Sequence, residues 1–174
     1  MPATHCMLDL ETLGVSSDAH ILSIGAVKFD LDAPPGELGT CLHIKVDSRP
    51  QPGAVIDALT VVWWMGQSDA ARAALVDGNR LPIGIALARL RDFLADVECL
   101  WSNGPTFDEV IARRAFQRYS LEFPVHFSGS RCFRTIRMIG EARCSPLFYQ
   151  PPEKAHDALE DAMAQARYVQ QVLA

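Results

Sequence analysis

The stretch Cys6-Met7-Leu8-Asp9-Leu10-Glu11 decides how this chain folds and where its chemistry lies. Apolar residues run directly into two acids, which predicts a buried strand with carboxylates at its C-terminal end. Strand side chains alternate between faces, so Asp9 and Glu11 point the same way. Like charges that close repel unless a cation lies between them, and oxygen ligands suit a divalent metal. The alternative is a solvated polar face, which is the usual role of an Asp-x-Glu tripeptide on a strand.

Length and composition limit the class of protein. At 174 residues the chain is long enough for one good core, and we expect a single domain over residues 1–174. No apolar run approaches the roughly 18 residues of a membrane span, and the start lacks the basic residues of a signal peptide. Five cysteines without C-x-x-C spacing favour reduced thiols over a zinc site. We therefore expect a cytoplasmic protein without membrane contact.

Charge is distributed unevenly. The net charge of -5 argues against a non-specific nucleic-acid binder. Residues 113–143, however, hold seven arginines against two acids, with aromatic residues between them. Arginine binds phosphate as a bidentate donor, so Arg131 and Arg134 are candidate phosphate contacts. A solvated helix face explains the same pattern equally well.

The pattern of apolar residues and turn signals predicts a mixed α/β protein. Three strands come first, with Gly- and Pro-rich turns between them, and helix-strand-helix units follow. Sites in such sheets lie at strand C-terminal ends and helix N-termini. The predicted strands cover about 5–10, 20–30, 39–46 and 99–101. Helices are predicted over 61–65, 69–76 and 157–173, and two more begin near Pro82 and Thr106. A further element of unassigned type spans about 132–142.

A second acid lies in Asn103-Gly104-Pro105-Thr106-Phe107-Asp108. Gly and Pro break the chain there, Thr106 can cap a helix, and Asp108 falls in its first turn. An acid at that place is also favoured by the helix dipole, so good helix chemistry alone would explain it. Phe107 is equally suited to the core.

A third segment, His156-Asp157-Ala158-Leu159-Glu160-Asp161, opens the last helix. Asp157 and Glu160 have the spacing of a capping box, and Asp161 lies one turn into the helix. His156 precedes the helix, where a loop can move it beside bound carboxylates. Its ordinary pKa near neutrality suits a general base, although an isolated surface histidine would look the same.

Together these blocks, in this order, resemble the DEDDh exonucleases, the RNase H-like 3'-5' exonuclease superfamily that includes proofreading subunits and RNase T. Trp63-Trp64 and Arg131-Cys132-Phe133-Arg134-Thr135 resemble more narrowly a subgroup of phage exonuclease VIII-like proteins and a bacterial exoribonuclease that trims RNA 3' ends. The resemblance implies an RNase H-like α/β fold. Its sheet would be mixed and five-stranded, with three antiparallel strands before the α-β-α units and helices on its flanks.

The resemblance also implies the chemistry. Asp9, Glu11 and Asp161 would hold one Mg²⁺ or Mn²⁺ ion, and Asp9 would bridge to a second ion with Asp108. His156 would be the general base. Four carboxylates in one pocket stay ionised only around cations, which supports the same assignment. The activity would be hydrolysis from the 3' end of single-stranded DNA or RNA, with release of nucleoside 5'-monophosphates.

Contacts to the terminal nucleotide are expected beside the acids, with Leu13 wedged against its base. The two adjacent tryptophans cannot face the same direction, so we expect one in the core and one exposed, and Trp64 is a candidate for base stacking. The subgroup resemblance implies a homodimer, which would cover the exposed tryptophan. The candidate substrate contacts are Thr12, Leu13, Trp64, Ser102, Asn103, Phe107, Arg131 and Arg134.

Two other functions are compatible with the same fold. One is a nucleic-acid-binding module with weak or no catalysis, although no motif acid is missing. The other is an RNase H-type endonuclease, which the H-x-A-x-x-D block disfavours. The sequence leaves open DNA against RNA, because no residue announces a contact to the 2'-hydroxyl. It also leaves open processivity and the pathway, whether phage recombination, repair or RNA processing.

Overall fold

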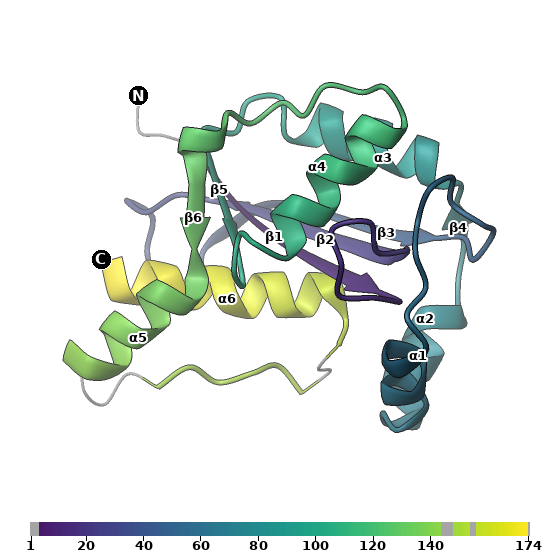
Figure 1. Cartoon of the computed structure of the whole chain (residues 1–174). Helices are drawn as coiled ribbons and strands as arrows, with labels where there is room; N and C mark the ends of the chain where they lie inside the picture. The colour runs from purple at the N-terminus through teal and green to yellow at the C-terminus, as the bar shows by residue number, and fades with distance from the viewer. Residues whose placement is uncertain (1–3, 144–147, 154–155, 174) are drawn as a thin grey trace.

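A mixed sheet with strand order β4-β3-β2-β1-β5-β6 forms the centre of the computed structural model, which describes residues 4–143, 148–153 and 156–173 (Figure 1). The chain follows the predicted order of strands and helices. In sequence, the elements are β1 His5–Thr12, β2 Ile21–Phe29, β3 Leu38–Val46, α1 Ala58–Met65, α2 Asp69–Val76, β4 Arg80–Leu81, α3 Ile83–Phe93, β5 Cys99–Ser102, α4 Asp108–Arg118, a 3-10 turn Phe127–Gly129, β6 Ser130–Cys132, α5 Phe133–Arg143 and α6 Ala158–Leu173.

The pairing of the strands confirms the RNase H-like α/β expectation and corrects the number of strands. β1, β2 and β3 pair antiparallel, whereas β5 joins β1 and β6 joins β5 in parallel. The described sheet has six strands rather than five, because Arg80 and Leu81 add β4 beside the end of β3. A strand of two residues is too short to show a periodic pattern, so the sequence does not predict it. The element expected over 132–142 is mainly helix α5.

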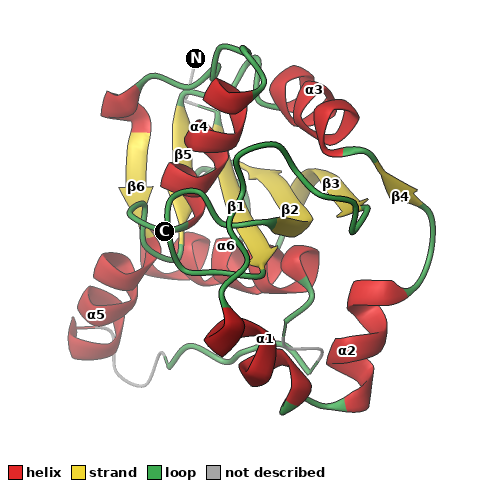
Figure 2. Cartoon of the chain, turned by 45° about the vertical axis from the view of Figure 1, so that its right-hand side comes forward, coloured by secondary structure: helices red, strands yellow, loops and turns green. Residues whose placement is uncertain are grey.

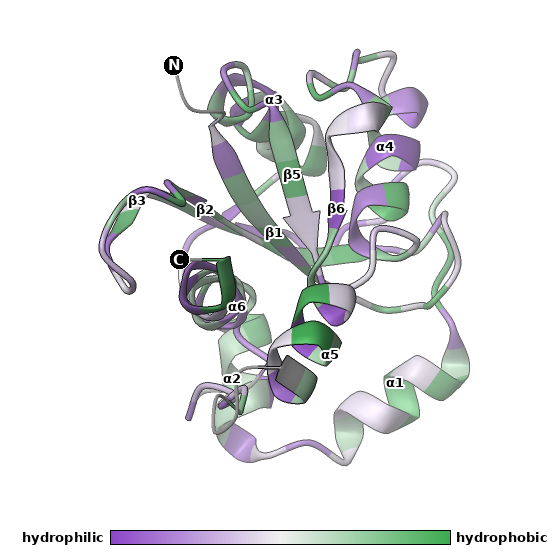
Figure 3. Ribbon diagram, turned by 90° about the vertical axis from the view of Figure 1, so that its left-hand side faces the viewer, coloured by the Kyte–Doolittle hydropathy of each residue, from purple (hydrophilic) through white to green (hydrophobic). Residues whose placement is uncertain are grey.

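Helices cover both faces of the sheet. Figure 3 shows α3 and α4 on one side and α5 and α6 on the other. Alternation along β1 divides the core accordingly: Leu8 and Leu10 pack toward α3 and α4, whereas Met7 packs toward α6. Asp9 follows Met7 on the same face. The sheet therefore presents Asp9 to the helix that carries Asp161.

Helices α1 and α2 lie outside these two layers (Figures 1 and 2). They attach through a small apolar cluster in which Trp64 packs on Leu22 and Ala71. Trp64 is 5% exposed, and its indole Nε1 donates a hydrogen bond of 2.9 Å to the carbonyl of Thr12. Trp63 is 47% exposed. One tryptophan is thus buried and its neighbour exposed, as the helical spacing predicts.

The described cysteines differ in their surroundings. Cys6 and Cys99 are buried, Cys41 is exposed and Cys132 is partly buried, so burial holds for only half of these free thiols; Cys144 lies outside the described residues. None of the helices that the structure describes is long and apolar enough to cross a membrane.

Gly25 allows α6 to reach the sheet. It pairs with Asp9 on β1 and with His43 on β3, so it stands between them in the sheet. A Cβ atom on Gly25 would overlap the backbone of Ala158, the first residue of α6. This close approach brings the start of α6, and with it Asp161, over β1.

Gly25→Ala should therefore displace α6 and lower the melting temperature. Overpacking a close contact costs about 1–3 kcal/mol, and here the clash is with backbone that cannot rotate away. Gly66→Ala is the matched control, because its φ is -81° and the new Cβ would lie 3.4 Å from the carbonyl oxygen of Trp63, an ordinary contact distance. Thermal unfolding followed by circular dichroism measures both. Equal melting temperatures for the two variants would contradict the role assigned to Gly25.

Candidate functional site

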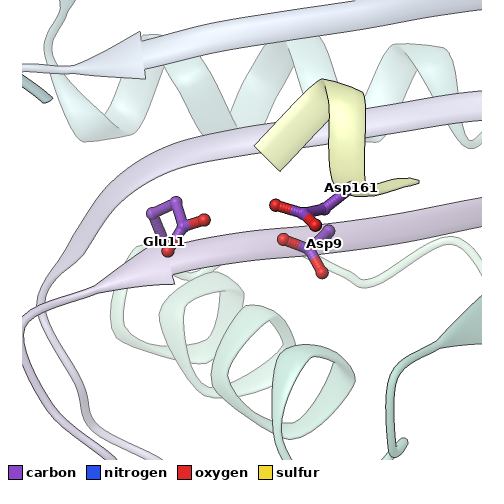
Figure 4. A group of neighbouring side chains, drawn as sticks. All are labelled: Asp9, Glu11 and Asp161. Carbon is purple, nitrogen blue, oxygen red and sulfur yellow. The ribbon is translucent and has the colours of Figure 1, made fainter. Parts of the chain in front are cut away.

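Three carboxylates from the two ends of the chain meet at the end of β1. Asp9 and Glu11 extend from β1, and Asp161 extends from the first turns of α6 (Figure 4). One oxygen of each lies within 4.8 Å of the others. The strand alternation and the close approach of α6 at Gly25 together produce this cluster.

Asp108 joins the same cavity from the opposite side of β1. Strand β5 ends at Ser102, opposite Leu8, so the backbone of β1 beyond that point has no strand partner on this edge. Asp108 Oδ1 takes that place and accepts a hydrogen bond of 3.1 Å from the amide of Leu10. Asp108 is only 3% exposed and lies close enough to Asp9 to raise the pKa of that carboxyl.

His156 lies at the rim of this cavity. Its backbone amide donates a hydrogen bond of 2.8 Å to Asp161 Oδ2, and its φ of 67° is rare for a residue with a side chain. The imidazole contacts the Trp63 and Trp64 rings edge to face, with centroids 5.0 and 5.8 Å away. The tryptophan pair therefore packs against the predicted base rather than away from the site.

The crowding of acids raises their pKa values. Burial, followed by the nearby Asp161 and Asp108, raises the pKa of Glu11 to about 8. Burial raises the pKa of Asp108 to about 7, and burial with the neighbouring acids raises that of Asp9 well above its ordinary value. Burial also raises the pKa of Asp161. An all-oxygen set that resists ionisation fits a hard divalent cation such as Mg²⁺ or Mn²⁺.

Metal-free protein should lose stability as the pH rises from about 5 to 8. Its folded acids retain protons that the unfolded chain releases near pH 4, so the folded state binds more protons in this window and stability falls as they leave. Differential scanning fluorimetry in EDTA measures the slope, and Glu11→Gln should flatten it. Mg²⁺ should raise the melting temperature most at pH 8. A melting temperature in EDTA that is constant from pH 5 to 8 would contradict this account.

An apolar pocket adjoins the acids. Both cavities share Leu10, Glu11 and Phe107, so one opens beside the other. Three of the predicted substrate contacts, Thr12, Trp64 and Phe107, line the apolar pocket, and Asn103 and Arg134 line the acid cavity. The full wall of the apolar pocket is Leu10, Glu11, Thr12, Gly14, Val15, Asp57, Leu59, Thr60, Trp63, Trp64 and Phe107.

Three other predicted contacts are not brought to either cavity. Leu13 packs partly buried against the cluster around Trp64. Ser102 is fully buried, and its Oγ has no partner among the described residues. The Arg131 guanidinium donates to the carbonyls of Ser128 and Ser130, near the start of β6 and away from the strand end where the acids lie.

The described arginines of residues 113–143 mostly bind groups within the protein. At the site, Arg134 forms no ion pair among the described residues, and its Nε donates a hydrogen bond of 3.4 Å to Asn103 Oδ1. Four of the seven arginines form ion pairs with acids of the protein, which leaves them less available to phosphate. The pairs are Arg113 with Glu109, Arg114 and Arg118 with Asp18, and Arg137 with Glu141.

Sequence reasoning missed several residues that line the cavities. Val15 and Trp63 line the apolar pocket, and Tyr149 and Gln165 line the acid cavity. Of these four, only Gln165 carried a usable signal, since it follows Asp161 by four residues and must share its helix face. Tyr149 lies in an irregular segment, where spacing predicts no direction.

The fold resembles that of exonuclease I. The zinc-bound E. coli ExoI–ssDNA complex aligns with a TM-score of 0.67 at 16% identity, over 95% of this chain and 39% of that one. E. coli Exonuclease I in complex with a dA16 oligonucleotide aligns with a TM-score of 0.65 at 16% identity, over 97% and 41%. A product-bound exonuclease I gives 0.64 at 14% identity, over 98% and 44%. The chain thus spans less than half the length of these proteins.

Sequence comparison is more specific. No curated protein matches the chain. The model of the 3'-5' exoribonuclease Rv2179c-like domain matches residues 4–173, which includes every carboxylate of the site. The chain, whose acids meet at the end of β1 in an RNase H-like fold, belongs to the 3'-5' exoribonuclease Rv2179c-like family.

Proposed function

We propose that this protein is a 3'-5' exonuclease that hydrolyses single-stranded nucleic acid with two Mg²⁺ or Mn²⁺ ions and releases nucleoside 5'-monophosphates. The observation that carries the proposal is the convergence of Asp9, Glu11 and Asp161 within 4.8 Å. Asp108 and His156 line the same cavity, so every group of the predicted set faces one volume.

The acids divide between two ion positions. Asp9, Glu11 and Asp161 would hold one ion, and Asp108 with Asp9 would hold the other, since Asp108 approaches Asp9 from the far side of β1. When bound, a pair of divalent ions lowers the pKa of a water and neutralises charge on the phosphate. The carboxylates would fix the positions of the ions, and the ions would bind the phosphodiester.

His156 would act as the general base. It would accept a proton from the attacking water as that oxygen bonds to phosphorus and the bond to the leaving 3'-oxygen breaks. The edge-on contacts to Trp63 and Trp64 would hold the imidazole at the cavity.

The apolar pocket would receive the terminal nucleoside. Its walls present Trp63, Val15 and Phe107 to a base, and stacking on an aromatic ring tolerates any base. Trp64 is buried beneath this wall, so it would support the pocket rather than stack freely. A pocket that holds one nucleotide beside the acids accounts for cutting at an end.

Single-stranded RNA is the first substrate to test, because the family description is that of an exoribonuclease, and DNA is the second, because one similar structure is E. coli Exonuclease I in complex with a dA16 oligonucleotide. Matched 5'-labelled RNA and DNA strands, a 3'-overhang duplex and a circular strand are incubated with Mn²⁺. We expect one-nucleotide shortening of linear strands and no cut in the circle. A cut circle would identify an endonuclease, and binding without any cleavage would identify a binding module.

We also propose a cytoplasmic homodimer. On α1, Leu59, Val62 and Met65 are 79%, 64% and 70% exposed, an apolar face that a second copy would cover. This face adjoins the apolar pocket through Leu59. Light scattering of wild type and Val62→Asp tests the dimer, and a monomeric wild type would overturn it.

A further inference from the structure

Gln165 is a buried amide that the fold does not require. It lies one turn after Asp161 on α6, so both side chains face β1. Its neighbours on the buried face of α6 are apolar, among them Ala162, Ala166 and Val169. Gln165 is only 2% exposed, and its Oε1 has no partner among the described residues. Burying a half-satisfied amide is unfavourable, whereas an apolar side chain would suit this place.

The other half of the amide binds a metal-site acid. Gln165 Nε2 donates a hydrogen bond of 3.1 Å to Asp9 Oδ1. Asp9 is the carboxylate assigned to both ions, so its orientation matters more than that of any other acid. A lysine or arginine here would bind Asp9 more strongly, but its positive charge would compete with the cation. A neutral donor restrains the carboxylate and leaves its charge available.

The same arrangement occurs at two more acids. Leu10 donates its backbone amide to Asp108 Oδ1, and His156 donates its backbone amide to Asp161 Oδ2. In each of these carboxylates one oxygen is held by a neutral N–H group. Glu11 has no such donor among the described residues. The donor to Asp9 is the one of these three that belongs to a side chain, so it is the one that a substitution can remove.

We propose that Gln165 is a positioning residue whose amide holds Asp9 in the orientation that binds metal. This inference rests on the proposed metal-dependent function. It predicts that loss of the amide weakens metal binding while the fold persists, because methionine is unbranched, apolar and of similar length. Removing a group that orients a metal ligand typically costs about 10–100-fold in affinity.

The test measures Mn²⁺ binding to the full chain by isothermal titration calorimetry, with melting temperatures in EDTA recorded for each protein. Gln165→Met and Gln165→Leu should both raise the Mn²⁺ dissociation constant by about 10–100-fold. Gln170→Met is the matched control. Gln170 is also a buried glutamine of α6, but it donates to the carbonyls of Asp30 and Glu37, away from the acids. This control should bind Mn²⁺ within twofold of wild type even if its melting temperature falls.

A folded Gln165→Met protein that binds Mn²⁺ within twofold of wild type would overturn the inference. So would an equal weakening in Gln170→Met, because the effect would then be general to α6. Failure of the wild type itself to bind Mn²⁺ would instead contradict the proposed function. The wild-type titration therefore distinguishes failure of the proposed function from failure of the role assigned to Gln165.

Discussion

Asp9→Asn should reduce mononucleotide release by about 10³-fold, because Asp9 is assigned to both ions and metal stabilisation of the transition state contributes several kcal/mol. Asparagine keeps the shape of the side chain. The substitution also removes a carboxyl whose own pKa is raised by burial and by the neighbouring acids, so metal-free protein should be more stable at pH 8. Loss of activity together with a higher melting temperature in EDTA would distinguish lost chemistry from misfolding.

A labelled 3'-end assay with Mn²⁺ measures this effect. Asp92→Asn is the control, because Asp92 has an exposed side chain on α3 and its ion pair with Arg91 lies outside the site. It should retain the wild-type rate. If Asp9→Asn cleaved within threefold of wild type, the assignment of Asp9 as the shared ligand would be wrong.

His156→Ala should lower the maximal rate by about 10²–10⁴-fold, which is the usual contribution of a general base. Metal binding should change little, because the hydrogen bond to Asp161 comes from the His156 backbone amide. The pH profile provides a second readout. The wild-type rate should rise through the range where a histidine loses its proton, and this inflection should vanish in the variant.

His126→Ala is the comparison for that experiment, since His126 is an exposed histidine beside the 3-10 turn, with its ring bonded to Ser128. It should cleave at the wild-type rate. If the His156→Ala protein kept the full rate and an unchanged pH profile, His156 would not be the general base and another group would have to be assigned that role.

Most of the fold was predictable because its elements carry their own signals. Alternation along β1, the apolar run of β2 and the helical spacing after Pro82 each depend on local sequence. Strand β4 carries no such local signal, because Arg80 and Leu81 become a strand only by pairing with the end of β3. The same holds for the short β6, which leads directly into α5.

The site was predictable to the extent that its residues come in recognisable blocks. The acids and His156 converge because β1 ends, and α4 and α6 begin, at the C-terminal end of the central strand. Individual substrate contacts were harder, since Leu13 and Ser102 belong to the right segments but turn into the protein interior. The side to which a loop residue points depends on packing partners that are distant in sequence.

The packing of α6 on β1 has a consequence for when the proposed activity first becomes possible during synthesis. Asp9 belongs to the first strand, whereas Asp161 belongs to the last helix, so one ligand is synthesised long before the other. A nascent chain that lacks α6 already displays Asp9 and Glu11 but has neither His156 nor Asp161 to complete the set. If the proposed set of carboxylates and His156 is required, the proposed activity would first become possible after α6 has been synthesised.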